Sequence, residues 1–184
     1  LHDALPICSD IDVFVIGSNV NAIAQETAKV QGVKRVLVAD NEIYAKPLAE
    51  NFAPLIHGIA NQYSHIVAAA TSFGKNLLPR LAALLDVDMV SEVTQIVDAS
   101  TYVRPLYAGN LNATVKNNEA IKLLTVRATA FDAAEDAAQS AVIETVTAGE
   151  ANKNLSRFVS EQIQQSDHPD LSTARIVVTG GRSL

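Results

Sequence analysis

The residues best suited to chemistry in this chain are hydroxyl, glycine and lysine residues at the start of a helical pattern. They form the run Thr71-Ser72-Phe73-Gly74-Lys75, which follows a short apolar stretch. Backbone amides and a lysine at a helix N-terminus can hold an anion such as a phosphate. The same residues also suit a structural role, in which Thr71 or Ser72 caps the helix and Gly74 makes the turn. Because neither a Walker pattern nor GxGxxG is present, we favour the structural role.

A better candidate for contact with a ligand is Gly180-Gly181-Arg182, which follows the apolar run 174–179. Glycines let the backbone approach a phosphate or a ring closely, and the arginine adds a charged, forked donor. The alternative is an ordinary glycine-rich turn after a strand.

The other reactive residue types are scattered along the chain. No Ser-His-Asp or Cys-His arrangement can be recognised, and we expect neither a catalytic residue nor a metal ligand. The residues concerned are the four histidines and the single cysteine: His2, His57, His65, His168 and Cys8.

The elements around these candidates alternate between strand and helix. Apolar runs at 12–17, 34–40 and 66–70 are typical of strands buried in a parallel sheet. Helical spacing follows each run; the first helix stops at Gly32 and the second begins at Pro47. This alternation predicts an α/β fold, a doubly wound three-layer αβα sandwich with a mainly parallel sheet.

The pattern changes after residue 86, where short β-rich segments are separated by Gly, Asn and Pro. They predict antiparallel strands or hairpins added to the parallel core. For Arg104 and Arg127, which lie inside them, an interface role and plain surface exposure are equally open. The segments are 91–97, 103–107, 111–115 and 122–127.

The domain organisation follows from these patterns. Residues 131–140 are expected to form a loop or one helical turn and 141–146 a strand, while 150–165 fit helix and strand equally well. We expect an N-terminal tail, one α/β domain, a linker, and a strand that opens a second domain. Their bounds are 1–11, 12–165, 166–173 and 174–184.

Composition limits the class of protein. The chain has 184 residues, 48% of them hydrophobic, and a net charge of −6, which argues against a broad nucleic-acid surface. One cysteine excludes an internal disulfide framework. No apolar stretch reaches the roughly 18 to 20 residues of a membrane helix. The absence of an initial methionine and the end within a motif suggest a fragment.

Six motifs, in order and over most of residues 12–184, resemble the α subunit of electron transfer flavoprotein. They are KRVLVAD (34–40), YSHIVAAATSFGKNLLPRLAALLDV (63–87), YVRPLYAGN (102–110), ATVK (113–116), KLLTVRATAFD (122–132) and ARIVVTGGRSL (174–184).

The resemblance implies a Rossmann-like N-terminal scaffold domain that packs on a β subunit to form a heterodimer. The next domain of the same subunit holds FAD, and residues 174–184 are similar to its first strand and turn. Arg182, Gly181 and Gly180 would then contact the flavin, whereas AMP belongs to the β subunit. Because the sequence stops before the other FAD contacts, this chain alone is not expected to retain FAD.

The resemblance further implies an electron carrier without substrate turnover of its own. It would link acyl-CoA and related dehydrogenases of fatty acid β-oxidation to a membrane quinone oxidoreductase. The setting would be cytoplasmic in bacteria and the mitochondrial matrix in eukaryotes. Two departures are visible: residues 1–9 do not match the family's first strand, so the sheet should lack a strand, and Ser183 replaces the glycine of GGRG.

Two other functions fit the residues. The first is a free-standing nucleotide-binding or nucleotide-hydrolysing α/β domain that uses residues 71–75. The second is an interaction module whose antiparallel strands dock a partner.

Overall fold

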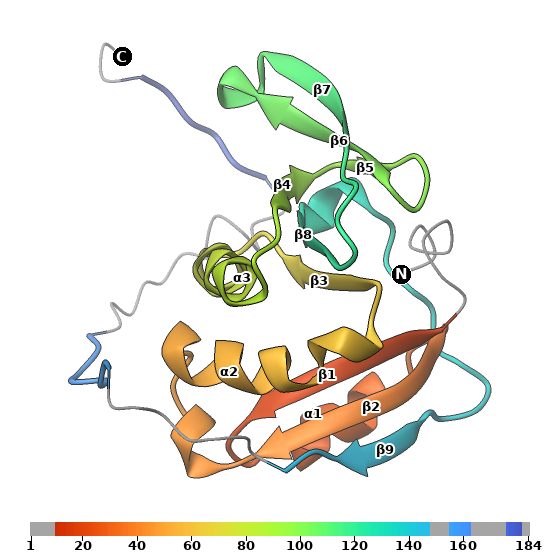
Figure 1. The fold of residues 1–184 in the computed structure, drawn as a ribbon, viewed down its shortest axis with the longest axis vertical. Helices are drawn as coiled ribbons and strands as arrows, with labels where there is room; N and C mark the ends of the chain where they lie inside the picture. Colours follow the sequence, from red (N-terminus) through yellow and green to blue (C-terminus); the bar gives the residue numbers. More distant parts are fainter. Residues whose placement is uncertain (1–9, 148–154, 163–175, 182–184) are drawn as a thin grey trace.

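A computed structural model describes residues 10–147, 155–162 and 176–181 (Figure 1). The helices longer than one turn are α1 (Asn21–Thr27), α2 (Ala49–Ile59) and α3 (Ser72–Leu85). Single 3-10 turns occur at η2 (Glu42–Tyr44), η3 (Ala60–Gln62), η4 (Tyr107–Gly109) and η5 (Ala128–Ala130). The strands are β1 (Ile11–Gly17), β2 (Val33–Asp40), β3 (His65–Ala69), β4 (Met89–Val93), β5 (Gln95–Ile96), β6 (Thr101–Leu106), β7 (Leu111–Lys116), β8 (Lys122–Val126) and β9 (Val142–Thr145).

The predicted α/β class is confirmed, and the parallel strands are divided between two sheets. One sheet has the order β1-β2-β9 and the other β3-β8-β4, and every neighbouring pair in both is parallel. Within the described residues β1 and β3 do not pair with each other.

The helices cover the sheets because apolar residues of the strands alternate between two faces. In β2, Val36 and Val38 pack with Ala24 and Ala28 beside α1. Ala39 of the same strand belongs instead to the core formed with α2 and α3. Helix α1 therefore lies on one side of the β1–β2–β9 sheet and α2 on the other (Figure 1).

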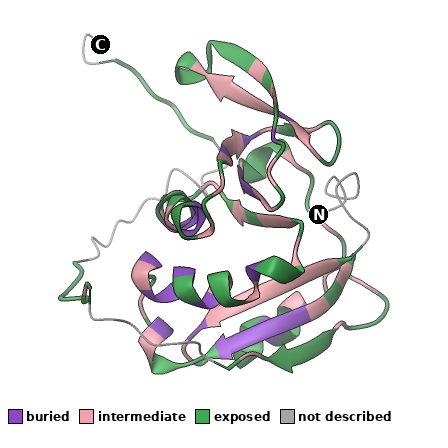
Figure 2. Ribbon diagram, in the orientation of Figure 1, coloured by how far each residue is buried: buried purple, intermediate pink, exposed green. Residues whose placement is uncertain are grey.

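The main core lies between α2, α3 and the strands. Leu78 and Leu81 of α3 pack there with Phe52 of α2 and Leu123 of β8, and all four are buried. Figure 2 shows the resulting pattern, with buried residues along β2 and on the inner sides of α2 and α3. Phe52 also meets Tyr44 and Phe73 edge-to-face, with ring centroids 5.3 and 5.1 Å apart.

The prediction that all β segments after residue 86 are antiparallel is wrong for two of them. β4 and β8 lie parallel to each other and complete the sheet that β3 begins. Their short apolar runs pack beneath α3, which gives them the burial of core strands. The antiparallel prediction is confirmed for β5, β6 and β7, which form a separate three-stranded sheet.

Two other local predictions differ from the structure. Pro47 precedes α2, whose N-cap is Leu48, and is not its first helical residue. Residues 176–181 form no strand although their sequence, IVVTGG, suits one. No partner strand lies beside them in the described part of the chain, and a strand requires one.

Residues 155–162 are neither helix nor strand, and the linker at 166–173 lies outside the described residues.

Candidate functional site

The first candidate run, at residues 71–75, lies where β3 passes into α3, and Thr71 caps the helix. Its Oγ1 accepts a hydrogen bond from the Gly74 N–H at 3.2 Å, and its carbonyl accepts one from the Lys75 N–H at 2.9 Å. The Ala70 N–H also donates to Val126 O at 2.8 Å, which joins this turn to the end of β8. The favoured structural role of Thr71 is therefore the one that the structure uses.

Lys75 is engaged by a carboxylate from the neighbouring strand. Its ammonium forms an ion pair with Glu92, and Arg127 Nη2 donates to the same carboxylate at 2.8 Å. Hydrogen bonds from Lys75 and Arg127 lower the pKa of Glu92. Glu92 takes the left-handed conformation, with φ of 56°, and its N–H donates to Thr125 Oγ1 at 2.9 Å. This β4 irregularity places the carboxylate between two cations and ties together the ends of α3, β4 and β8.

A polar cavity of about 390 Å³ adjoins this ion-pair cluster and is lined in part by Lys75, Ser91 and Arg104. Arg104 Nη2 donates to Ser91 Oγ at 2.9 Å, whereas its buried Nε has no hydrogen-bond partner among the described residues. Arg104 thus faces inward from β6 towards β4, and Arg127 lies in an exposed ion pair. Glu92 is shared by Lys75 and Arg127, whereas Arg104 reaches only the neutral Ser91 hydroxyl, so the cluster keeps an excess of positive charge.

The second candidate run is only partly described. Gly180 and Gly181 are exposed and form no regular structure, and Arg182 lies outside the described residues. The two glycines line neither this polar cavity nor the larger apolar cavity between β1 and β3. Because Arg182 lies outside the described residues, the role of the three residues as flavin contacts stays a prediction.

The two histidines in the described part of the chain do not form a reactive site. His57 is exposed on α2. His65 hydrogen-bonds through its ring to Ser64 Oγ, Ala99 O and the Tyr102 hydroxyl, and burial lowers its pKa. Over the described ranges, no three His, Cys, Asp or Glu side chains gather as a metal site would require. His2, His168 and Cys8 lie outside them.

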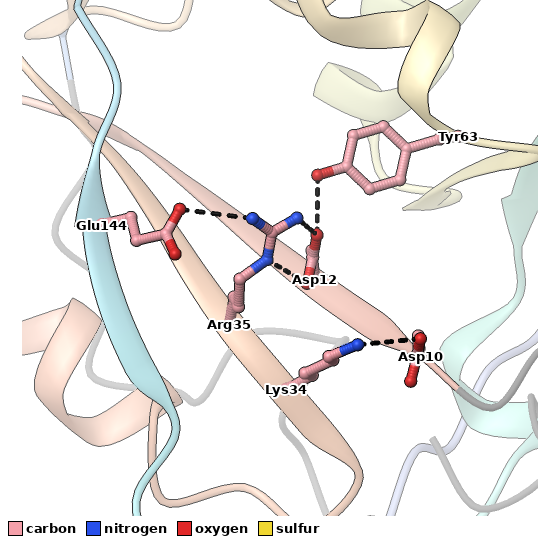
Figure 3. A network of polar contacts seen from close by, with 6 residues as sticks. All are labelled: Asp10, Asp12, Lys34, Arg35, Tyr63 and Glu144. Atoms are coloured by element: carbon pink, nitrogen blue, oxygen red, sulfur yellow. Dashed lines mark hydrogen bonds and ion pairs between the residues drawn. The ribbon is translucent and has the colours of Figure 1, made fainter.

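A polar network at the start of β1 and β2 was not foreseen from the sequence (Figure 3). Arg35 donates to the Asp12 carboxylate from Nε at 3.1 Å and from Nη2 at 2.5 Å, and Nη1 lies 3.3 Å from Glu144 Oε2. The Tyr63 hydroxyl donates to Asp12 at 2.8 Å. These residues are far apart in the sequence. The signal that could have suggested their contact is the presence of polar residues at the starts of apolar strand runs.

This network joins the two parallel sheets, because Tyr63 directly precedes β3 while Asp12 and Arg35 belong to β1 and β2. Burial of Asp12 tends to raise its pKa, but the hydrogen bonds from Arg35 and Tyr63 outweigh burial and lower it. Burial, followed by the hydrogen bond to Asp12, raises the pKa of Tyr63 to about 12. The network therefore holds a carboxylate ionised and a phenol protonated near the starts of β1 and β3.

Asp12→Asn should lower the free energy of unfolding at pH 7 by about 1.5 kcal/mol, since it removes the charge that accepts three hydrogen bonds. The lowered pKa of folded Asp12 contributes stability above its unfolded pKa of about 3.9. That contribution is lost as the pH falls through the lower folded value. Urea titrations at several pH values should show the difference between wild type and variant shrinking below about pH 4.

Asp10→Asn provides a matched control, because Asp10 pairs with Lys34 at 2.9 Å while both side chains are largely exposed (Figure 3). Its effect should stay within about 0.5 kcal/mol at every pH. A loss in Asp12→Asn that is equally large at pH 2 would mean that shape, and not charge, stabilises this site.

The antiparallel sheet forms an exposed feature of a different kind, projecting from the rest of the molecule (Figure 1). At the tip of the β6–β7 hairpin, Tyr107, Ala108 and Gly109 all have positive φ, at 50°, 56° and 90°. Tyr107 is 78% exposed, and Leu111 beside it is 51% exposed. The tip thus offers apolar surface on a backbone held in a defined shape.

Comparison with known proteins identifies a family. Residues 1–151 match the family model described as an electron transfer flavoprotein domain. The chain is 51% identical to the electron transfer flavoprotein subunit alpha of Pseudomonas aeruginosa and 46% identical to that of Paracoccus denitrificans, over 181 residues each. Both matches cover 98% of this chain and 58% of the relative. A probable mitochondrial subunit alpha of Caenorhabditis elegans is 41% identical over 96% of this chain and 53% of its own length.

These similarities confirm the resemblance found in the motifs. The chain spans less than two thirds of the length of these relatives. Within the parts of the chain that the structure describes, no helix combines the length and apolar character needed to cross a membrane. The family model covers most of the chain, including all three helices and all nine strands seen in the described residues. The chain belongs to the electron transfer flavoprotein family.

Proposed function

We propose that the chain forms part of the α subunit of an electron transfer flavoprotein, which carries electrons through FAD and turns over no substrate itself. The observation that carries this proposal is 51% identity over 98% of the chain to a relative named as that subunit. Lys75, which belongs to the run that the nucleotide-binding alternative would use, is engaged in an ion pair with Glu92, and Glu92 also pairs with Arg127.

The role proposed for this domain is to dock the β subunit of a heterodimer. Support comes from the β6–β7 hairpin, whose tip exposes Tyr107 and Leu111 away from the core. Exposed aromatic and aliphatic side chains on a fixed backbone are typical of interface anchors. This proposal contains part of the interaction-module alternative, since both assign a docking role to the domain.

FAD is the cofactor proposed for the subunit, with Gly180, Gly181 and Arg182 among its contacts. The two glycines are exposed, so a ligand can reach their backbone, but no described cavity encloses them. Residues beyond those described would have to complete the flavin site, and AMP is assigned to the β subunit.

The electron partners are also proposed from the similarity to relatives named as the α subunit. Acyl-CoA and related dehydrogenases would be the donors and a membrane quinone oxidoreductase the acceptor. The proposed location is the cytoplasm in a bacterium or the mitochondrial matrix in a eukaryote. Names of both bacterial and mitochondrial relatives occur among the similar proteins.

The decisive experiment is coexpression of a full-length subunit, containing this sequence, with a candidate β subunit. We expect a yellow heterodimer with flavin absorbance. Arg182→Ala should weaken flavin retention by at least about tenfold or shift its potential, because a charged donor near the ring is lost. Arg157→Ala, at an exposed arginine outside the glycine run, should change neither.

Each failure in this experiment has a separate meaning. A colourless full-length pair that does not copurify would overturn the electron-carrier proposal. A yellow pair in which Arg182→Ala binds flavin normally would overturn only the assignment of Arg182. ATP or AMP binding by the chain alone would favour the nucleotide-binding alternative.

A further inference from the structure

The polar cavity beside α3 lies where a helix, the parallel sheet and the antiparallel sheet meet. Its lining residues come from α3, β4, β6 and β8. Those with charges or hydroxyl groups are Lys75, Ser91, Glu92, Arg104 and Thr125. The volume of about 390 Å³ is near the lower end of the roughly 300 to 1000 Å³ that is usual for ligand pockets. The cavity therefore suits a small ligand with polar groups.

The charges at this cavity do not balance. Lys75 and Arg127 both pair with the single carboxylate of Glu92. Arg104 adds a further cation, and its described side-chain partner is the neutral hydroxyl of Ser91. Three cations thus gather around one anion, although the chain as a whole has a net charge of −6. Like charges that are partly removed from water repel one another, and a dianion would neutralise this cluster.

Arg104 also holds a buried donor that the described residues leave unpaired. Its Nη2 donates to Ser91 Oγ at 2.9 Å, whereas the buried Nε has no hydrogen-bond partner among them. A buried N–H group without an acceptor carries the full cost of its lost hydration. Guanidinium N–H groups form a fork that matches two oxygens of one carboxylate or phosphate. The unpaired group therefore favours an oxyanion as the ligand of this cavity.

The available donors are side chains, and they differ from the backbone amides that the run 71–75 suggested. The N–H groups of Gly74 and Lys75 are bonded to Thr71, at 3.2 Å to Oγ1 and 2.9 Å to O. Of that run, only Lys75 lines the cavity. A ligand here would therefore be held by ammonium, guanidinium and hydroxyl groups from three different elements.

The cavity is accessible and its hydroxyl group can contribute. The side chains of Lys75 and Glu92 are 49% and 30% exposed, so a small ion can enter from solvent beside them. Ser91 Oγ accepts from Arg104 and keeps its own O–H as a donor. A metal cation would be repelled by this cluster, and an apolar ligand would leave its charges without water or partners.

We propose that this cavity binds a small dianionic oxyanion, a class that includes inorganic phosphate and short dicarboxylates. Arg104 and Lys75 pair with its oxygens, and the Ser91 hydroxyl donates to one of them. The ligand thereby ties β6 of the antiparallel sheet to β4 and α3 of the parallel part. This inference goes beyond the proposed electron-carrier function and does not depend on it.

The first test follows the Arg104 Nε–H directly by NMR of the isotope-labelled chain. Its signal is assigned by its absence from the spectrum of Arg104→Lys. Sodium phosphate is titrated in one arm and sodium malonate in the other, with sodium chloride keeping the ionic strength constant. We expect a saturable shift of this signal in at least one arm, with a Kd of about 1 mM or lower. The arm with the lower Kd identifies whether phosphate or dicarboxylate chemistry is preferred.

The second test measures the affinity of variants by isothermal titration calorimetry. Arg104→Gln should weaken binding by at least about tenfold, because it removes the charge and the fork. Ser91→Ala should weaken binding by about threefold, since one neutral donor is lost. The matched control is Lys116→Gln on β7, which makes the same change in net charge at an exposed residue that does not line the cavity. It should leave the affinity unchanged.

Circular dichroism establishes that each variant is folded. If Arg104→Gln does not fold, the wild-type NMR titration and Ser91→Ala still decide the question. The proposal is overturned if neither anion binds saturably, if the Arg104 Nε–H signal does not shift, or if Lys116→Gln weakens binding as much as Arg104→Gln. If both anions fail but a candidate β subunit shifts that signal, the counter-ion is a carboxylate of a protein partner, and the small-ligand proposal is wrong.

Discussion

Gly74→Ala is expected to lower the free energy of unfolding by about 3 kcal/mol, although alanine is a better helix former than glycine. Gly74 is buried in the first turn of α3, close to the end of β3. A Cβ at this position would lie 2.0 Å from the carbonyl oxygen of Ala69, which is a backbone atom that cannot rotate away. Helix α3 would have to move off the strand and weaken the Thr71 cap.

The sequence pattern assigned Gly74 to the turn before the helix. Gly74 is instead part of the helix and does not have positive φ. Close approach of the backbone, not left-handed geometry, is what excludes a side chain. Substitution by valine, which is larger and β-branched, should lower the free energy of unfolding at least as much.

Gly58→Ala is the matched control for Gly74→Ala. Gly58 also lies in a helix, α2, but nothing lies within 4 Å of a Cβ placed there. The change should therefore stabilise the chain by about 0.5 to 1 kcal/mol through helix propensity alone. Urea unfolding of both variants measures the two effects. Equal stability of Gly74→Ala and wild type would mean that α3 does not approach Ala69 so closely.

Leu81→Ala should lower the free energy of unfolding by about 2 to 5 kcal/mol, which is the usual range for removing a fully buried leucine side chain. Leu81 is 0% exposed and belongs to the core that α2 and α3 share with Leu123 of β8. Truncation leaves a cavity where a helix meets the β3–β8–β4 sheet. Urea unfolding should show a lower midpoint with an unchanged slope.

Leu84→Ala is the control on the same helix, because Leu84 is 46% exposed. Its effect should be below about 1 kcal/mol. If Leu81→Ala and Leu84→Ala lowered the free energy of unfolding equally, the side of α3 that carries Leu81 would not be the side that faces the core.

The sequence by itself determined the local elements and the class of the fold. Continuous apolar runs identified β1, β2 and β3, and helical spacing identified α3 with Thr71 or Ser72 as its cap, because these signals depend on near neighbours in the chain. The sequence motifs also identified the family. The same local signals did not separate the parallel strands β4 and β8 from the antiparallel hairpin.

Only the tertiary structure decided which strands became neighbours and which polar groups met. A short apolar run has the same appearance in a parallel and an antiparallel strand, so the direction of β8 followed from its place between β3 and β4. The contacts of Asp12 with Arg35 and Tyr63, and of Lys75 with Glu92, join residues that are distant in sequence. Such contacts leave no periodic signal, because they depend on where strand ends come together in space.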